Sequence, residues 1–63
     1  MGISLRAARI DKNMTQEDVA TSLKVNKKTV AAWESGKSMP NAEKVGELCA
    51  LLGFKYDDIR WRG

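Results

Sequence analysis

Lysine side chains gather in one short stretch of this 63-residue sequence. The segments 1–23 and 38–63 are each neutral, so the formal net charge of +3 falls within residues 24–37. The charged residues of that stretch are Lys24, Lys27, Lys28 and Lys37, with Glu34 as the single acid. A cluster of ammonium groups on one surface attracts a polyanion such as nucleic acid. The alternative is an ordinary solvated lysine face.

Catalytic chemistry has little support in the composition. With no histidine and one cysteine, the chain lacks the usual zinc ligand sets and cannot form an internal disulfide. Cys49 lies in the apolar run VGELCALLG, where we expect a buried thiol. No nucleophile, base and paired carboxylates converge in the pattern, so we expect a binding protein with no cofactor, metal or small-molecule ligand and no enzymatic activity.

The size predicts one domain over residues 1–63, which buries only about 60% of its unfolded surface. No segment approaches the roughly 20 apolar residues of a membrane span, and the N-terminus does not resemble a secretory signal. We therefore expect a cytoplasmic protein.

Two short helices joined by a tight turn are predicted around the lysine-rich stretch. Thr15 and Asp18 have the spacing of a capping box, so the first helix should begin at Gln16 and continue until the pattern breaks at Lys24. Asn26 is a suitable N-cap for the second helix, and Gly36 a suitable end. The second helix has Val30 and Trp33 on its buried face, which leaves Lys27, Lys28, Ala31 and Ala32 facing outward.

The remaining segments predict further helices and an all-α fold. A helix over about residues 4–12 should bury Leu5, Ala8 and Ile10 and end at Asn13. Another should span residues 42–52, between Asn41 and Gly53. Phe54, Tyr56 and Ile59 suggest a short fifth helix, which gives a compact bundle of four to five helices. Trp61 could pack back on the domain, form a dimer interface, or mark the start of a removed segment.

A set of residues resembles the helix-turn-helix of the phage repressor and Cro family, also called the XRE type. They are Gln16, Ala20, Val25, Val30, Trp33, Glu34 and Gly36. The resemblance extends from about Leu5 to Ile59 and implies a lambda-repressor-like fold. Lys24 is a departure, because the family commonly has glycine at this turn. A left-handed backbone at Lys24 would cost roughly 1–2 kcal/mol.

The resemblance also implies roles for individual side chains. Base-reading positions fall on Lys27, Lys28 and Ala32, with Thr29 contacting either a base or the backbone, and phosphate-binding positions on Gln16, Asn26, Ser35, Lys37 and Ser38. Lysine can donate to guanine, and the Ala32 methyl can contact a thymine methyl. Alternatively, Lys27 and Lys28 bind phosphate only, Gln16 is simply an exposed polar residue, and Ser38 belongs to an ordinary polar turn. The family pattern pairs Arg9 with Glu34 as a partly buried structural ion pair, where two independent surface charges are the alternative.

These observations favour a sequence-specific DNA-binding regulator of bacterial or phage origin, most simply a repressor or its N-terminal DNA-binding domain. A domain with one recognition helix covers few base pairs, so we expect a homodimer on a pseudo-palindromic operator in double-stranded DNA. The alternative is a protein-interaction module of the same fold, such as an antitoxin or adaptor. That alternative predicts an exposed apolar patch near Tyr56 and Trp61.

Overall fold

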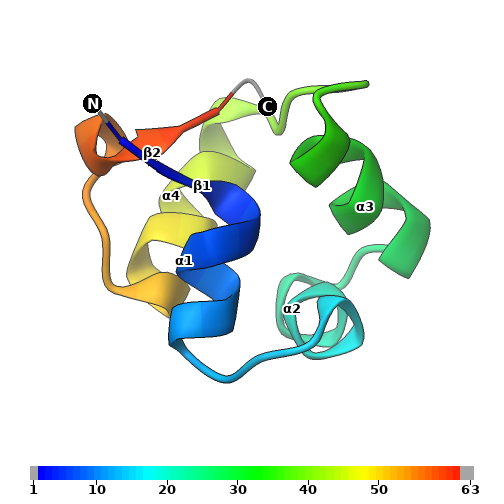
Figure 1. The fold of residues 1–63 in the computed structure, drawn as a ribbon. Helices are drawn as coiled ribbons and strands as arrows, with labels where there is room; N and C mark the ends of the chain where they lie inside the picture. The colour runs from blue at the N-terminus through cyan, green and yellow to red at the C-terminus, as the bar shows by residue number, and fades with distance from the viewer. Residues whose placement is uncertain (1, 62–63) are drawn as a thin grey trace.

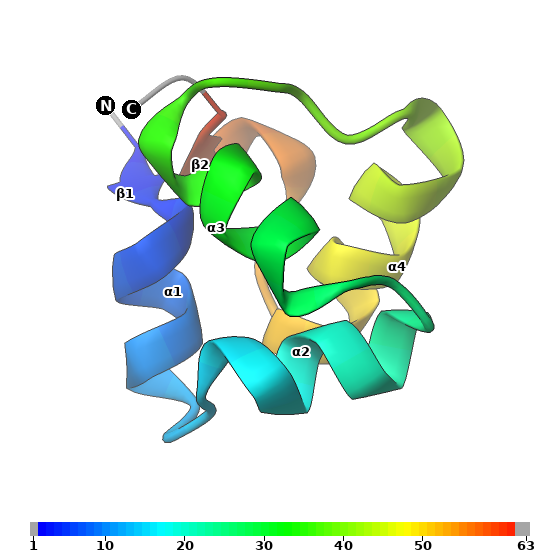
Figure 2. The same cartoon turned by 90° about the vertical axis from the view of Figure 1, so that its right-hand side faces the viewer.

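Helices make up most of the computed structural model, which describes residues 2–61. In chain order the elements are β1 (Ile3–Ser4), α1 (Leu5–Asp11), α2 (Gln16–Leu23), α3 (Lys27–Ser35), α4 (Ala42–Leu52), the 3-10 helix η1 (Tyr56–Asp58) and β2 (Ile59–Arg60). Figure 1 shows α1 in front of α4, with α3 on the opposite side of the molecule from η1. In the view turned by 90°, α3 lies at the front, above α2 and between α1 and α4 (Figure 2).

Local capping chemistry explains where the helices begin. Thr15 and Asp18 form both hydrogen bonds of a capping box, which confirms the predicted start of α2 at Gln16. The side chains of Asn26 and Asn41 each accept a hydrogen bond from a backbone N–H in the first turn of α3 and α4. The Ser4 hydroxyl accepts one from Ala7, so Ser4 caps α1 and lies just outside it.

The helix ends agree with the sequence as well. Gly36 and Gly53 follow α3 and α4 in the left-handed conformation, with φ of 82° and 76°. The predicted bounds of α4, residues 42–52, are confirmed. α1 ends at Asp11, one residue earlier than predicted, and Asn13 turns the chain with φ of 57°.

The prediction of an all-α fold is wrong in one respect. β1 and β2 form a two-stranded parallel sheet in which Ile3 pairs with Ile59 and Ser4 with Arg60. The predicted fifth helix is only the single turn η1, because the chain extends into β2 after Asp58. Gly2 lies tightly against this sheet, since a Cβ there would come within 2.9 Å of the backbone nitrogen of Arg60.

The core lies between α4 and the other helices. The largest fully buried side chains are Leu48, Leu52, Val19 and Val30. Trp33 is also buried, as predicted, whereas Cys49 is only partly buried against the core. The prediction for Ile10 is wrong: its side chain is 49% exposed. α1 buries Leu5, Ala8 and Arg9 instead, at the i, i+3 and i+4 spacing of one helix face.

Trp61 packs back onto the domain, the first of the three possibilities that the sequence left open. It is 9% exposed, its indole Nε1 donates to the Tyr56 carbonyl at 3.0 Å, and the two rings stack with centroids 5.7 Å apart. Of the apolar patch expected near Tyr56 and Trp61, the Tyr56 ring is exposed and the Trp61 ring is buried, and the exposed Met39 lines a hollow with Trp61. Among residues 2–61, no helix has the length and apolar character needed to cross a membrane.

Candidate nucleic-acid interface

The turn between α2 and α3 brings the two helices together at a sharp angle (Figure 2). Lys24, the residue that departs from the family pattern, adopts the left-handed conformation with φ of 58° and ψ of 44°. The next residue, Val25, donates its backbone N–H to the Ala20 carbonyl at 2.9 Å. Ala20 is buried, and its small side chain lets the helices approach closely. The turn therefore keeps its geometry without glycine.

A buried ion pair fixes the end of α3 relative to α1. Arg9 donates from Nε to Glu34 Oε2 at 2.6 Å and from Nη2 to Oε1 at 3.2 Å, and its Nη1 donates to the Met14 carbonyl at 2.7 Å. Gln16 joins this network, because its Nε2 donates to Glu34 Oε1 at 3.0 Å. An amide nitrogen carries two hydrogens, so one remains for a phosphate. The network positions α2 and α3 as one body.

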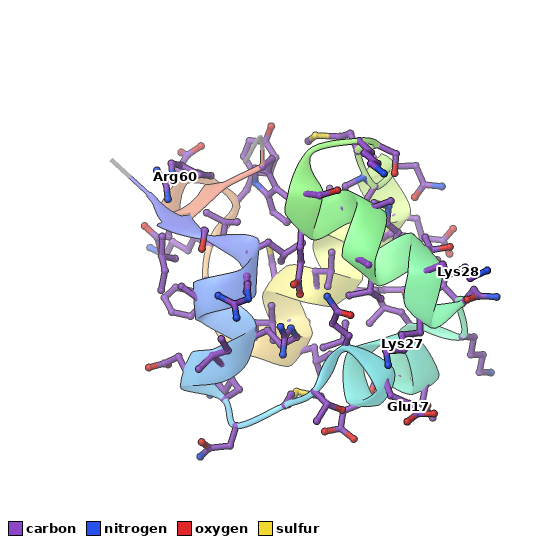
Figure 3. All side chains as sticks on the ribbon, turned by 45° about the vertical axis from the view of Figure 1, so that its right-hand side comes forward. Glu17, Lys27, Lys28 and Arg60 are labelled. Atoms are coloured by element: carbon purple, nitrogen blue, oxygen red, sulfur yellow. The ribbon has the colours of Figure 1, made fainter. Side chains whose placement is uncertain are left out.

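The outer face of α3 combines lysine ammonium groups with small side chains. Lys27 and Lys28 are exposed in its first turn, while Ala31 and Ala32 are only half-buried. In Figure 3, Lys28 projects outward from the start of α3, whereas Lys27 extends over α2 toward Glu17. A helix with small residues in its middle and cations at its N-terminal end can approach a groove of DNA closely.

Several of the predicted contact residues line two hollows on the surface. One, of about 450 Å³, is lined by Lys28, Ala31, Ala32, Ser35 and Lys37. A second, of about 530 Å³, includes Gln16 and Lys27 in its lining. The first hollow thus brings together three predicted residues of α3 and Lys37 of the following loop, and the second brings together two predicted residues at the starts of α2 and α3.

The other predicted contact residues do not line these two hollows. Ser38 lines a third hollow, with Trp61. Asn26 and Thr29 line none of the three, and the Asn26 side chain is engaged in capping α3. The Ser35 hydroxyl donates to the Ala32 carbonyl at 3.2 Å, which leaves its oxygen free only as an acceptor.

An acidic residue of this surface was missed in the sequence. Glu17 is exposed, lines the same hollow as Gln16 and Lys27, and lies below Lys27 in Figure 3. Asp18 follows it in the capping box, where the Thr15 backbone N–H and then the Thr15 side chain lower the pKa of its carboxyl. The start of α2 thus carries two carboxylates beside its free N–H groups. In the sequence, their position directly after Gln16 was the signal that could have indicated acidic residues at this surface.

The fold and the basic face of α3 define a small domain of the helix-turn-helix class. The sequence model described as "Helix-turn-helix" matches residues 5–59, and the chain belongs to that family. The match ends before Trp61.

Curated relatives cover most of this chain. It is 34% identical over 55 residues to the HTH-type transcriptional activator BcrR of Enterococcus faecalis, covering 87% of this chain and 27% of that protein. It is 33% identical to multiprotein-bridging factor 1 of Debaryomyces hansenii and 31% identical to human endothelial differentiation-related factor 1, in each case over 87% of this chain and 37% of the relative. The chain therefore spans only about a quarter to two-fifths of the length of these relatives.

Proposed function

We propose that the domain is a sequence-specific regulator of transcription that binds double-stranded DNA through α3. The observation that carries this proposal is the outer face of α3, where Lys27 and Lys28 precede half-buried alanines and the whole net charge of the chain is concentrated between residues 24 and 37. Membership of the helix-turn-helix family supports it. So does the similarity to a protein named as a transcriptional activator.

In this proposal α3 lies in the major groove with its first turn at the base edges. Lys27 or Lys28 donates to guanine O6 and N7, and Ala32 contacts a thymine methyl. Thr29 contacts a base or the backbone. Gln16, Asn26, Lys37 and Ser38 contact the sugar-phosphate backbone, and so does Ser35 once its hydroxyl turns away from the Ala32 carbonyl. These contacts fix the register without reading sequence.

A two-fold dimer extends this small contact to a useful operator. One recognition helix covers few base pairs, so a pseudo-palindrome with half-sites about one helical turn apart supplies the affinity. Bound at a promoter of a bacterium or phage, such a dimer represses transcription by occlusion or activates it by recruitment.

Selection from a randomised duplex pool tests the proposal. An enriched two-fold motif is the expected result, with log K falling by about 0.9 per neutralised phosphate against log salt. The double variant Lys27→Gln/Lys28→Gln should lose the motif and lower the slope. Lys55→Gln is the matched control, because Lys55 is exposed and immediately precedes η1. η1 lies on the opposite side of the molecule from α3 (Figure 1). Absence of binding at low salt would refute DNA binding, and salt-dependent binding without a motif would refute sequence readout.

A protein-interaction module is the second candidate function, supported by the similarity to multiprotein-bridging factor 1. It predicts a protein partner whose binding survives Lys27→Gln/Lys28→Gln. Co-purification of tagged wild-type and double-variant domains distinguishes the two: a partner retained by both, without any duplex binding, favours the module.

A further inference from the structure

The loop of residues 36–39 connects α3 to the segment before α4 and carries two of the proposed phosphate-binding residues, Lys37 and Ser38. Its first half is tied to α3: the backbone N–H groups of Lys37 and Ser38 both point at the Ala32 carbonyl, at 3.0 and 3.4 Å. Within residues 2–61, every backbone hydrogen bond of this loop runs to α3. These bonds fix one side of the loop, so its other side depends on packing.

Trp61 lies on that other side. A hollow of about 200 Å³ is lined by Gly36, Lys37, Ser38 and Met39 of the loop and, from elsewhere in the described chain, by Trp61. Trp61 thus shares this hollow with a loop that precedes it by more than twenty residues. Movement of this ring would therefore change the space into which the loop can relax.

The Trp61 ring is fixed by contacts with Tyr56 and the core. Its Nε1 donates to the Tyr56 carbonyl, its face stacks on the Tyr56 ring, and it belongs to the buried core cluster. It follows β2 directly, and β2 is paired with β1 at the other end of the chain. β2 also lies so close to Gly2 that a side chain there would meet the backbone of Arg60.

We propose that Trp61 is a positioning residue for DNA binding, which holds the 36–39 loop so that Lys37 and Ser38 reach the DNA backbone. This inference rests on the proposed function. It adds a residue beyond the family match, which ends at residue 59. It also links the sheet formed by the two ends of the described chain to the phosphate contacts beside α3.

The first test measures the loop itself, without DNA. Amide hydrogen exchange of Lys37 and Ser38 should become faster in Trp61→Ala, while Trp61→Phe, which keeps a ring, should retain most of the protection. Leu51→Ala is the control for general destabilisation, because Leu51 is a partly buried core residue of α4. Exchange should be compared at equal global stability, set with urea. Unchanged protection in Trp61→Ala, or equal loss in Leu51→Ala, would overturn the proposal.

The second test is a double-mutant cycle on duplex binding with the selected site. Loss of one phosphate contact should weaken binding up to about eightfold at 0.1 M salt and lower the salt slope by about one. As a single variant, Trp61→Ala should produce this change. In a Lys37→Gln/Ser38→Ala background it should cause little further change, because the effects of residues that act through one another are not additive. Additive effects would overturn the positioning role.

A variant remote from the DNA tests the link through the sheet. Gly2→Ala should displace β2 and reproduce part of the Trp61→Ala effect on loop exchange, since its new methyl group would clash with backbone atoms of residues 58–60. If the wild-type domain binds no duplex, the proposed function fails, and the exchange experiment still decides whether Trp61 positions the loop.

Discussion

The guanidinium of Arg9 and the carboxylate of Glu34, 25 residues apart in the sequence, form a two-point ion pair whose side chains are 11% and 5% exposed. The pair joins α1 to the end of the proposed recognition helix, and it also receives the Gln16 amide. A charge pair this far from solvent holds a geometry more than it adds net stability.

Loss of one partner should therefore be costly. Arg9→Met leaves the Glu34 carboxylate buried without its cation, and we expect the free energy of unfolding to fall by about 3–5 kcal/mol. Urea denaturation followed by the fluorescence of the two core tryptophans, Trp33 and Trp61, measures this change. The double variant Arg9→Met/Glu34→Leu should recover much of the loss, because neither charge remains buried. A double variant as unstable as the sum of the single variants would contradict this account.

Relief of the left-handed turn should stabilise the domain. Lys24 has φ of 58°, so Lys24→Gly should raise the free energy of unfolding by about 1 kcal/mol, which is the strain removed less the added freedom of the unfolded chain. Asn13→Gly is the matched control at φ of 57°; it should gain less, because asparagine tolerates this conformation. An equal gain at both positions would show that side-chain strain at Lys24 is not the cause.

The loss of stability at acid pH should depend on the capping box of α2. Hydrogen bonds from Thr15 lower the Asp18 pKa below its ordinary 3.8 in the folded state, so the unfolded state takes up the proton first as the pH falls. The stabilisation is fully present above pH 3.8 and is lost as the pH drops through the lower folded-state pKa. Asp18→Asn keeps an acceptor but no charge, so thermal melts should show a shallower loss of Tm below pH 4. An unchanged acid limb in this variant would contradict the prediction.

The accuracy of the sequence predictions follows the range of the interactions involved. The caps Thr15, Asn26 and Asn41 act within three residues, so the bounds of α2 and α4 could be read from the sequence. The pairing of Ile3 with Ile59 joins strands of two residues from opposite ends of the chain, and neither strand has a recognisable pattern.

The positions of Ile10, Trp61 and the Gln16 side chain depend on neighbouring elements rather than on local sequence pattern. Ile10 is exposed because the buried face of α1 is formed by Leu5, Ala8 and Arg9, with Arg9 turned toward Glu34, and Ile10 falls outside this face. The position of Trp61 depends on Tyr56 and the core that receives it. The Gln16 hydrogen bond to Glu34 depends on the helix crossing, so it had no local signal.

Glu17 should weaken DNA binding. Its exposed carboxylate lines the hollow shared by Gln16 and Lys27, where a phosphate is expected, so Glu17→Gln should raise duplex affinity about two- to fivefold at low salt. Glu43→Gln is the matched control, because Glu43 is likewise the exposed second residue of a helix, here α4. Both variants lose the same favourable interaction with a helix N-terminus. Equal affinities for the two variants would show that Glu17 does not face the phosphate.

Base reading by Lys27 and Lys28 should be separable from phosphate binding. If one of these lysines donates to guanine N7, replacing that guanine with 7-deazaguanine should cost the wild-type domain about 1–3 kcal/mol. The same replacement should cost little once that lysine is replaced by glutamine, because the interaction is already absent. If a lysine only neutralises phosphate, replacing it with glutamine would instead lower the salt slope by about one and weaken binding to all duplexes equally. Fluorescence anisotropy titrations with each guanine replaced singly measure both quantities, and a uniform response across all guanines would leave these lysines as phosphate contacts only.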